Sequence, residues 1–450
     1  MEQSIRPEGP FFATYRQTSE WRDLDRGALR IEVQSRGLET SNWWDSSEWQ
    51  PGATTVVAEG VPAAWFGKNA SRASESQLQS AAETLALSPE RVLLTALAAP
   101  DLRAQPDATL HGVIHHLVAF TWQSHPVRLF LTTYTMLPAA VEITRDRPFD
   151  LFWHPWGDVT SRTTFENWTL EPNGIRYPRQ FDVVSMGLPD RSFIVTELHF
   201  NPAIPADAFA VTDQVRQAKP RPAVEDLPFG APGAPVVDLA PGLVQIAGSW
   251  NVGEALQDDG IVVIEGPISS GYSAQAIADA EKRFTGKRVQ AVVTTSDSWP
   301  HIGGLREYAA RGIAIHALDL NRAIIERLLA APHRETPDRL ARNPRGATLE
   351  IVRQRTLLGT GPNRMELIPY RTVTGERQMM IYFPERQILY SSDLFSRGRD
   401  GSFFLPGMVL ECVEAARREK LRVRTVFGMH LAPTPWSDLE EATKRPGAER

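Results

Sequence analysis

The stretch that decides the fold of this 450-residue chain is Thr294-Thr295-Ser296-Asp297-Ser298-Trp299-Pro300-His301-Ile302-Gly303-Gly304. It begins at the end of the apolar segment 289–294, which predicts a buried strand. The segment 304–310 that follows has the residue pattern of a helix. The stretch is therefore expected to be a polar loop between a strand and a helix.

Three other segments share its organisation, because each is an apolar run that ends in a polar residue. The first, Gly260-Ile261-Val262-Val263-Ile264-Glu265-Gly266-Pro267, lies before the loop. The second, Tyr382-Phe383-Pro384-Glu385-Arg386-Gln387-Ile388-Leu389-Tyr390-Ser391-Ser392-Asp393-Leu394-Phe395, follows it. The third, Val426-Phe427-Gly428-Met429-His430, lies near the C-terminus.

In order and spacing, these four segments resemble the metallo-β-lactamase fold. The loop is similar to the signature T-H-x-H-x-D-H-x-G-G of that family in a degenerate form. Aligned without gaps, Ser296 and Ser298 stand at the first two His positions and Pro300 at the Asp position, whereas His301 keeps its identity. Glu265 stands where the family usually has an Asp at the end of an early strand.

The resemblance also covers the end of the chain and implies a fold. Asp393 matches the metal-bridging Asp of the family, and His430 matches its terminal Gly-His metal-ligand loop. The implied fold is an αββα sandwich of two sheets with helices outside and the functional loops along one edge. Residues 296–301, Asp393 and His430 would all lie on that edge.

The resemblance implies at most one metal ion. Two His and one carboxylate, here His301, Asp393 and His430, suit one zinc ion or a non-haem Fe(II), each with open positions. A second metal would need three further His, and Ser296, Ser298 and Thr374 stand in those places. One zinc ion is expected, with iron or no metal as the alternatives. The candidates for a substrate pocket are Ser296, Ser298, Thr374 and Trp299, the last of which lies beside His301.

Three residues are candidates for proton transfer or for orienting a ligand, namely Asp297, Glu265 and His301. Pro300 fixes its own φ and restricts Trp299, so it can reshape the loop and turn Asp297 inward. Asp297 would then be a fourth ligand, a general base, or the partner that orients His301. Capping of its own turn is the structural alternative.

Three functions follow from this set. The first is a hydrolase in which a metal-bound water, with its pKa lowered to roughly 7, attacks an ester, lactone, amide or related bond. The alternative is a metal-free protein that binds a small molecule or a partner, since a fold does not by itself establish a function. An Fe(II) oxidoreductase using the same residues is less favoured.

The amino-acid composition limits the classes of protein to which the chain can belong. The hydrophobic fraction of 42% and the charged fraction of 23% are those of a globular protein. No apolar run approaches the ~18 residues of a membrane span, and the net charge of −6 gives no electrostatic case for nucleic acid. A small-molecule substrate is the expected partner, and a homo-oligomer is left open. Residues 1–4 lack an export signal, which predicts a cytoplasmic protein, or a periplasmic or secreted one if a leader was removed.

The chain is expected to be an α+β protein of two domains, because a domain typically has ~100 to 200 residues. A Pro- and Gly-rich linker is placed at 219–235. It separates a β-rich N-terminal domain, 1–218, from the metallo-β-lactamase-like domain, 236–450. Successive strand-like segments predict an antiparallel sheet in the first domain, curved around a helix. The last such strand is placed at 192–200, after a turn at 187–190. In the second domain Ser273 is the predicted cap of a helix at 273–284.

Overall fold

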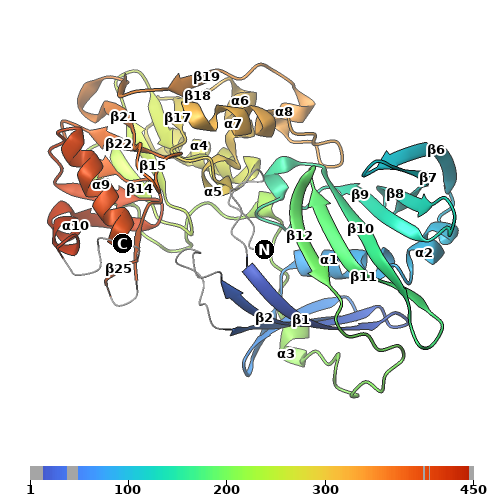
Figure 1. Ribbon diagram of the computed structural model, residues 1–450. Coiled ribbons are helices and arrows are strands. Elements are labelled where there is room, and N and C mark those ends of the chain that lie inside the picture. The colour runs from blue at the N-terminus through green and yellow to red at the C-terminus, as the bar shows by residue number, and fades with distance from the viewer. Residues whose placement is uncertain (1–13, 38–48, 399–400, 405, 445–450) are drawn as a thin grey trace. The chain divides into compact units, whose positions relative to one another are not determined.

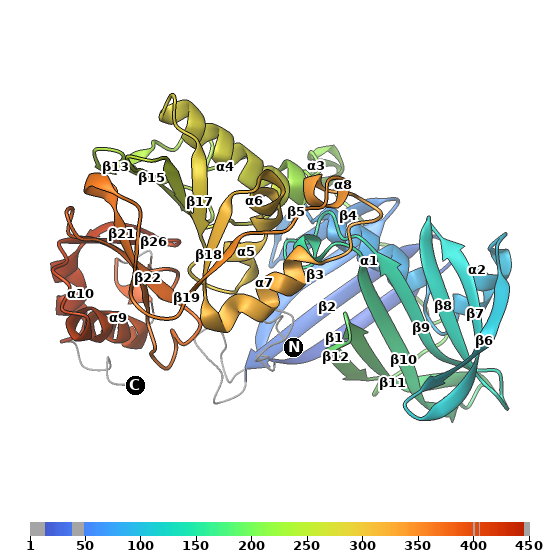
Figure 2. The ribbon, with the colours of Figure 1, turned by 90° about the horizontal axis from the view of Figure 1, so that it is seen from above.

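The computed structural model describes residues 14–37, 49–398, 401–404 and 406–444. It divides into two compact units, shown in Figures 1 and 2. The first unit consists of Met1–Trp153 and Gly157–Pro222, and the second of His154–Trp156 and Ala223–Arg450. The predicted cellular compartment rests on residues 1–4, which lie outside the described residues. Within the described ranges, none of the helices is both long and apolar enough to cross a membrane.

The first unit contains two antiparallel sheets whose strands are neighbours in chain order. The five-stranded sheet is formed by β1 (Thr14–Asp23), β2 (Ala28–Gly37), β3 (Gln50–Ala58), β4 (Val61–Phe66) and β5 (Asn69–Arg72). The seven-stranded sheet is formed by β6 (Arg103–Leu110), β7 (Val113–Trp122), β8 (His125–Thr132), β9 (Pro138–Arg145), β10 (Val159–Leu170), β11 (Arg176–Ser185) and β12 (Leu188–Ile194). The predicted antiparallel, β-rich character is confirmed, but the strands form two sheets rather than one.

Each sheet of this unit has its own helix. Helix α1 (Glu75–Ala86) begins with a capping box formed by Ser74 and Gln77, and it packs Ala81 and Leu85 against the five-stranded sheet. Helix α2 (Val92–Ala98) packs against the seven-stranded sheet instead. Two successive helices therefore cover two sheets. A short helix, α3 (Asp213–Gln217), lies against the first of these sheets.

The predicted turn at 187–190 is misplaced. The chain reverses at Met186 and Gly187, which have φ values of +52° and +83°, and Leu188 already begins β12. Positive φ at two successive residues is the geometry of a tight hairpin. The Pro and Asp that suggested the turn lie in β12, which ends at Ile194 instead of continuing to residue 200.

The second unit is built on two larger sheets. One has seven strands: β13 (Val237–Ala240), β14 (Leu243–Ile246), β15 (Val252–Leu256), β16 (Ile261–Ile264), β17 (Val289–Val293), β18 (Ala314–Leu318) and β19 (Leu349–Val352). The other has six: β20 (Thr356–Leu358), β21 (Met365–Pro369), β22 (Met379–Phe383), β23 (Ile388–Tyr390), β26 (Thr425–Gly428) and β27 (Leu431–Pro435). Strands β24 (Ser396–Arg397) and β25 (Phe403–Phe404) form a separate pair.

Helices lie on both outer sides of these sheets, as Figures 1 and 2 show. On the side of the seven-stranded sheet are α4 (Ser270–Arg283), α5 (Trp299–Ile302), α6 (Leu305–Arg311), α7 (Arg322–Leu329) and α8 (Arg339–Arg342). On the other side, α9 (Pro406–Arg418) and α10 (Trp436–Ala442) pack on the six-stranded sheet, with Cys412 of α9 fully buried. The second unit is therefore an αββα sandwich, as predicted.

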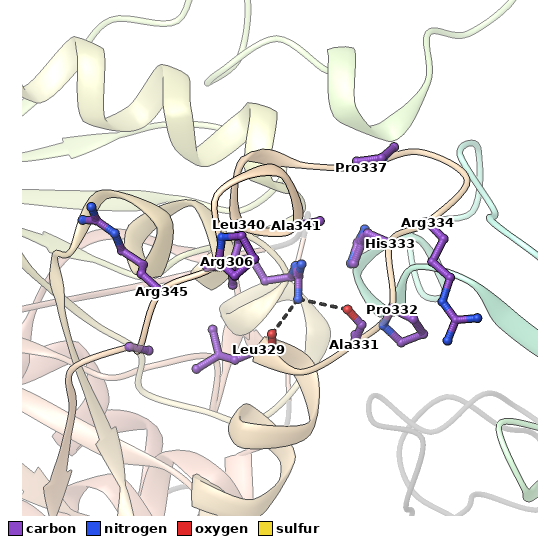
Figure 3. A pocket seen from close by; sticks show the side chains of 12 residues that line it. Arg306, Leu329, Ala331, Pro332, His333, Arg334, Pro337, Leu340, Ala341 and Arg345 are labelled. Atoms are coloured by element: carbon purple, nitrogen blue, oxygen red, sulfur yellow. Dashed lines mark hydrogen bonds between the residues drawn. The ribbon is translucent and has the colours of Figure 1, made fainter.

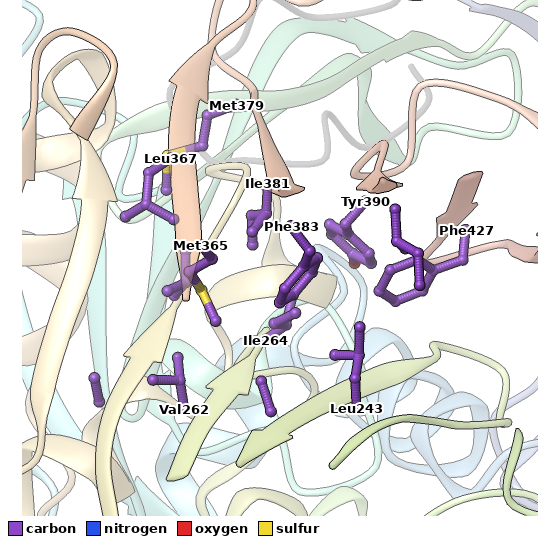
Figure 4. Packing of buried hydrophobic residues seen from close by; sticks show 14 of the residues in the cluster. Leu243, Val262, Ile264, Met365, Leu367, Met379, Ile381, Phe383, Tyr390 and Phe427 are labelled. Atoms are coloured by element: carbon purple, nitrogen blue, oxygen red, sulfur yellow. The ribbon is translucent and has the colours of Figure 1, made fainter. Parts of the chain in front are cut away.

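The core lies between the two sheets. Val262 and Ile264 of β16 project into it from one sheet, and Met365, Ile381 and Phe383 meet them from the other (Figure 4). Because side chains alternate along a strand, residues 261 and 263 face outward, and they are nevertheless fully buried. Helix α4 packs on β16 and covers them. Burial on both faces explains why these strands are continuous apolar runs.

Truncating a side chain of this core should destabilise the second unit. Phe383 is fully buried between the sheets, so Phe383→Ala should leave a cavity and lower the free energy of unfolding of the second unit by about 3 to 5 kcal/mol. Val373→Ala is the control, because this side chain is 92% exposed, and it should change stability by less than about 0.5 kcal/mol. Urea denaturation of the full chain measures both, and equal effects would contradict the packing described.

Candidate functional site

The site loop, residues 294–298, connects β17 to α5. Hydrogen bonds from a side chain of the loop hold its backbone in place. The hydroxyl of Thr294 donates to the carbonyl oxygens of Ser296 (3.0 Å) and His301 (3.3 Å). Pro300 lies in the first turn of α5, where a proline is tolerated because its missing N–H would have no helical partner. Pro300 is thus compatible with the short helix that begins at Trp299, and that helix carries His301, which is fully buried.

The end of the loop is held by close backbone approach. A Cβ on Gly304 would lie against Ser273 Oγ and 2.5 Å from the carbonyl oxygen of Ser269, so only glycine fits there. Ser269, and not the predicted Ser273, caps α4, since its side chain accepts from the N–H of Tyr272 at 3.1 Å. The loop and the first turn of α4 are thus packed directly on one another.

His301 lies between two carboxylates. Its Nδ1 is 2.8 Å from Glu265 Oε2, and its Nε2 is 3.0 Å from Asp393 Oδ2. The imidazole ring is fully buried. Both distances are those of ion pairs, although neither contact has the alignment of a hydrogen bond. The predicted residues Glu265, His301 and Asp393 are therefore brought together, with the histidine in the middle.

Glu265 is the centre of a buried polar network. Its Oε1 accepts from Tyr390 Oη at 2.9 Å and from the hydroxyl of Thr295, and its Oε2 accepts from the Thr295 N–H at 3.2 Å. The Thr295 hydroxyl also lies 2.7 Å from Ser392 Oγ. These contacts join the ends of β16, β17 and β23. Because buried polar groups are costly unless they are hydrogen-bonded, the network fixes the carboxylate that faces His301.

The backbone is strained at the same place. Glu265, Ile268 and Ser392 have φ values of +77°, +70° and +62°. A non-glycine residue pays of order 1 to 3 kcal/mol to hold such a conformation, and residues of this kind cluster at functional sites. Glu265 contacts His301, and Ser392 directly precedes Asp393, so both of these residues belong to the site.

The two carboxylates favour a positive charge on His301. Burial lowers the pKa of His301, but Glu265 and Asp393 outweigh it and raise the value to about 10. Burial likewise raises the pKa of Asp393, and the charge of His301 overcomes it and holds that pKa below its usual value. At neutral pH the centre of the site is therefore an imidazolium between two carboxylates.

His430 does not complete a three-ligand set with the other two predicted ligands. It is exposed, and its pKa is lowered because part of the ring is desolvated and because His301 is positive, which outweighs the attraction of Asp393. Across the described ranges, no three His, Cys, Asp or Glu residues are grouped so that they could hold a metal ion. The residues as arranged do not fit a zinc site, which needs at least three protein ligands around one point.

Asp297 points toward an arginine. It is buried, and its Oδ2 lies 3.3 Å from Arg377 Nη1. The carboxylate that contacts His301 Nδ1 is Glu265, so Asp297 is not the residue that orients the ring.

The four pocket candidates have different environments. Ser296 and Ser298 are each only 1% exposed, so neither faces solvent. Trp299 is half-buried and packs edge-on against Trp250, with ring centroids 5.1 Å apart. Thr374 is exposed, and both its N–H and its hydroxyl donate to Glu411 of α9. Of the four, Trp299 therefore has a partly exposed ring, whereas Ser296 and Ser298 are buried and Thr374 is bonded to Glu411.

Three residues of the network, Thr295, Tyr390 and Ser392, are absent from the set predicted from the sequence. All three lie inside the segments that suggested the fold. The available signal is position alone, since each lies at a strand end beside a predicted site residue. Their contacts with Glu265 are made between strands that are far apart in the sequence.

Comparisons with known proteins give fold neighbours. No family model matches the chain, and no curated protein matches it. Among solved structures, it is similar to a metallo-β-lactamase from Pseudomonas aeruginosa in a mono-zinc form, with 13% identity, 48% of this chain and 96% of that one covered, and a TM-score of 0.36. A metallo-β-lactamase from Pontibacter korlensis gives 14% identity, 47% and 97% coverage and a TM-score of 0.35.

A stereoselective inverting sec-alkylsulfatase from a Pseudomonas species is also similar, with 16% identity and a TM-score of 0.35. Here 46% of this chain is covered, and the match spans only 41% of the alkylsulfatase. The fold neighbours of this chain are thus metallo-β-lactamases and alkylsulfatases, at low identity and low TM-score, while the sandwich described above rests on its own strands and helices.

The charge on His301 should make stability depend on pH. The folded pKa of about 10 lies above the unfolded value of 6.5, so the stabilisation is complete below pH 6.5 and is lost as the pH rises through 10. The slope is at most about 1.4 kcal/mol per pH unit. Unfolding free energies at several pH values, for the wild type and His301→Gln, should therefore converge toward pH 10. His199→Gln, at an exposed position, is the control, and a constant difference for His301→Gln would refute the assignment.

Proposed function

We propose that the edge site of the second unit binds a small molecule without a metal ion, with the imidazolium of His301 in the place of a cation. The observation that carries this proposal is that both ring nitrogens of His301 face carboxylate oxygens, at 2.8 Å and 3.0 Å. A metal ligand must offer an unprotonated nitrogen, whereas both nitrogens of an imidazolium are donors.

The accessible part of the site indicates what it would bind. The Asp393 side chain is 18% exposed, although its Oδ1 is itself buried and has no hydrogen-bond partner among the described residues. Trp299, two positions before His301, and Trp250 present half-buried aromatic rings. A ligand with a hydrogen-bond donor for Asp393 and an apolar face for the tryptophans matches these groups. Catalysis is not required by any of them.

The second candidate function is a hydrolase with one metal held by His301, Asp393 and His430. The geometry of His301 favours this candidate, because its contacts with Glu265 and Asp393 are not aligned as hydrogen bonds. Side chains that bind one metal ion also lie close together without hydrogen bonds between them. The metal would supply a water of lowered pKa that attacks an ester, lactone or amide. His430 would have to move to join the other two residues.

Metal content separates these functions. Full-length protein purified without chelator or affinity metal, then incubated with zinc or Fe(II) and desalted, is assayed by elemental mass spectrometry. The proposal expects no bound metal in the wild type and no difference in a His301→Ala, His430→Ala double variant. A His111→Ala, His199→Ala variant is the matched control, because it removes two exposed histidines of the first unit.

One zinc ion per chain that disappears in the His301, His430 variant and persists in the control would overturn the metal-free proposal and support the hydrolase. One iron under the same conditions would point to the oxidoreductase.

A further inference from the structure

A cavity lies elsewhere in the second unit, away from His301. A cavity of about 500 Å³ is bounded by the end of α7, the loop that follows it, α8 and the segment 343–347 (Figure 3). None of the residues predicted from the sequence to form a site lines it. Its volume is that of a pocket for a small organic molecule, which typically has about 300 to 1,000 Å³.

A buried arginine holds the walls of this cavity in place. Arg306 of α6 is 3% exposed, and its Nε and Nη2 donate to the two oxygens of Asp338 at 2.6 Å and 3.0 Å. Asp338 also accepts from the N–H of Ala341 at 2.7 Å and so caps α8. The bidentate pair therefore fixes α8 to α6.

The same guanidinium fixes the other wall. Arg306 Nη1 donates to the carbonyl oxygens of Leu328 (3.1 Å), Leu329 (2.7 Å) and Ala331 (3.2 Å). Two of these contacts are drawn in Figure 3. They add a donor to carbonyls in and just after the last turn of α7, of which that of Leu328 also accepts from the N–H of Ala331 at 3.1 Å. Because Arg306 is neutralised by Asp338 and uses its donors on the protein itself, it builds the cavity and is not free to bind a ligand.

The remaining polar side chains of the lining give it a positive character. They are His333, Arg334 and Arg345, and the lining contains no Asp or Glu. Burial, followed by the charge of Arg306, lowers the pKa of His333 to about 4, so this ring is neutral at physiological pH. Arg334 already takes part in another interaction. Arg345 is exposed, and no ion pair or hydrogen bond of its side chain is found in the described part of the chain.

The rest of the lining is apolar and stiff. Leu329 and Leu340 come from α7 and α8, and Pro332, Pro337 and Pro344 come from the segments between and after them. Proline fixes its own φ, so the walls lose little entropy when a ligand is held. Such a surface favours an aliphatic or aromatic body over a hydrated inorganic ion.

We propose that this cavity binds an organic carboxylate, with its apolar body against the leucine and proline walls and its charged group on the guanidinium of Arg345. A guanidinium matches the planar carboxylate with two parallel hydrogen bonds. The lining of this cavity contains no residue of the His301 site. A test of carboxylate binding therefore does not depend on the function proposed for that site.

Octanoate is the probe, and isothermal titration calorimetry on the full chain is the measurement. We expect saturable binding of one octanoate per chain, with 1-octanol and octylamine binding at least about tenfold more weakly, because a charge-assisted hydrogen bond is lost. Arg345→Met should lower octanoate affinity by about tenfold or more. Arg342→Met is the matched control, because Arg342 is an exposed arginine of α8 that does not line the cavity.

Ala347→Phe is a second variant, which fills the lining without changing charge and should abolish binding of all three probes. Absence of octanoate binding to the wild type would overturn the proposal. So would equal binding of octanoate and octanol, or an equal loss in Arg345→Met and Arg342→Met. Far-ultraviolet circular dichroism of each variant establishes that it is folded, and binding should persist in the His301→Ala, His430→Ala variant.

Discussion

A buried histidine ring held between two carboxylates is the interaction on which the edge of the sandwich depends. His301 contacts Glu265 from β16 and Asp393 from the end of β23, so it ties the two sheets together where their functional loops meet. A buried ion pair is costly to desolvate and strongly destabilising to break. The charge of the imidazolium offsets the cost of burying the carboxylate charges. The hydrogen bonds from Thr295 and Tyr390 hold the carboxylate of Glu265 in position.

The fold of the second unit was predictable because its strands are buried on both faces. Residues 260–265 and 289–294 are apolar runs, which place β16 and β17 within about one residue of their observed bounds. Strand β15 escaped prediction because Gly253 and Glu254 interrupt its pattern. In the structure Glu254 is fully buried and pairs with Arg283 of α4 at 2.9 Å, a tertiary contact without a local signal.

The site was predictable in part. The spacing of the four segments brought Glu265, His301 and Asp393 to one edge, as expected for side chains that follow neighbouring strands. It could not tell that Asp297 would face Arg377, because the two are far apart in sequence and a helix that contains Pro300 and His301 begins two residues after Asp297. Nor could it tell that Thr374 would bond to Glu411. Those outcomes depend on side-chain directions that the order of residues does not contain.

The glycine contact between the site loop and α4 has a consequence for access. Since Gly304 lies directly on Ser269 and Ser273, the loop cannot swing outward as a gate unless the first turn of α4 moves with it. On the side of Asp393 and His430, by contrast, the side chains are at least partly open to solvent. The position of the loop is therefore coupled to that of the helix that follows β16.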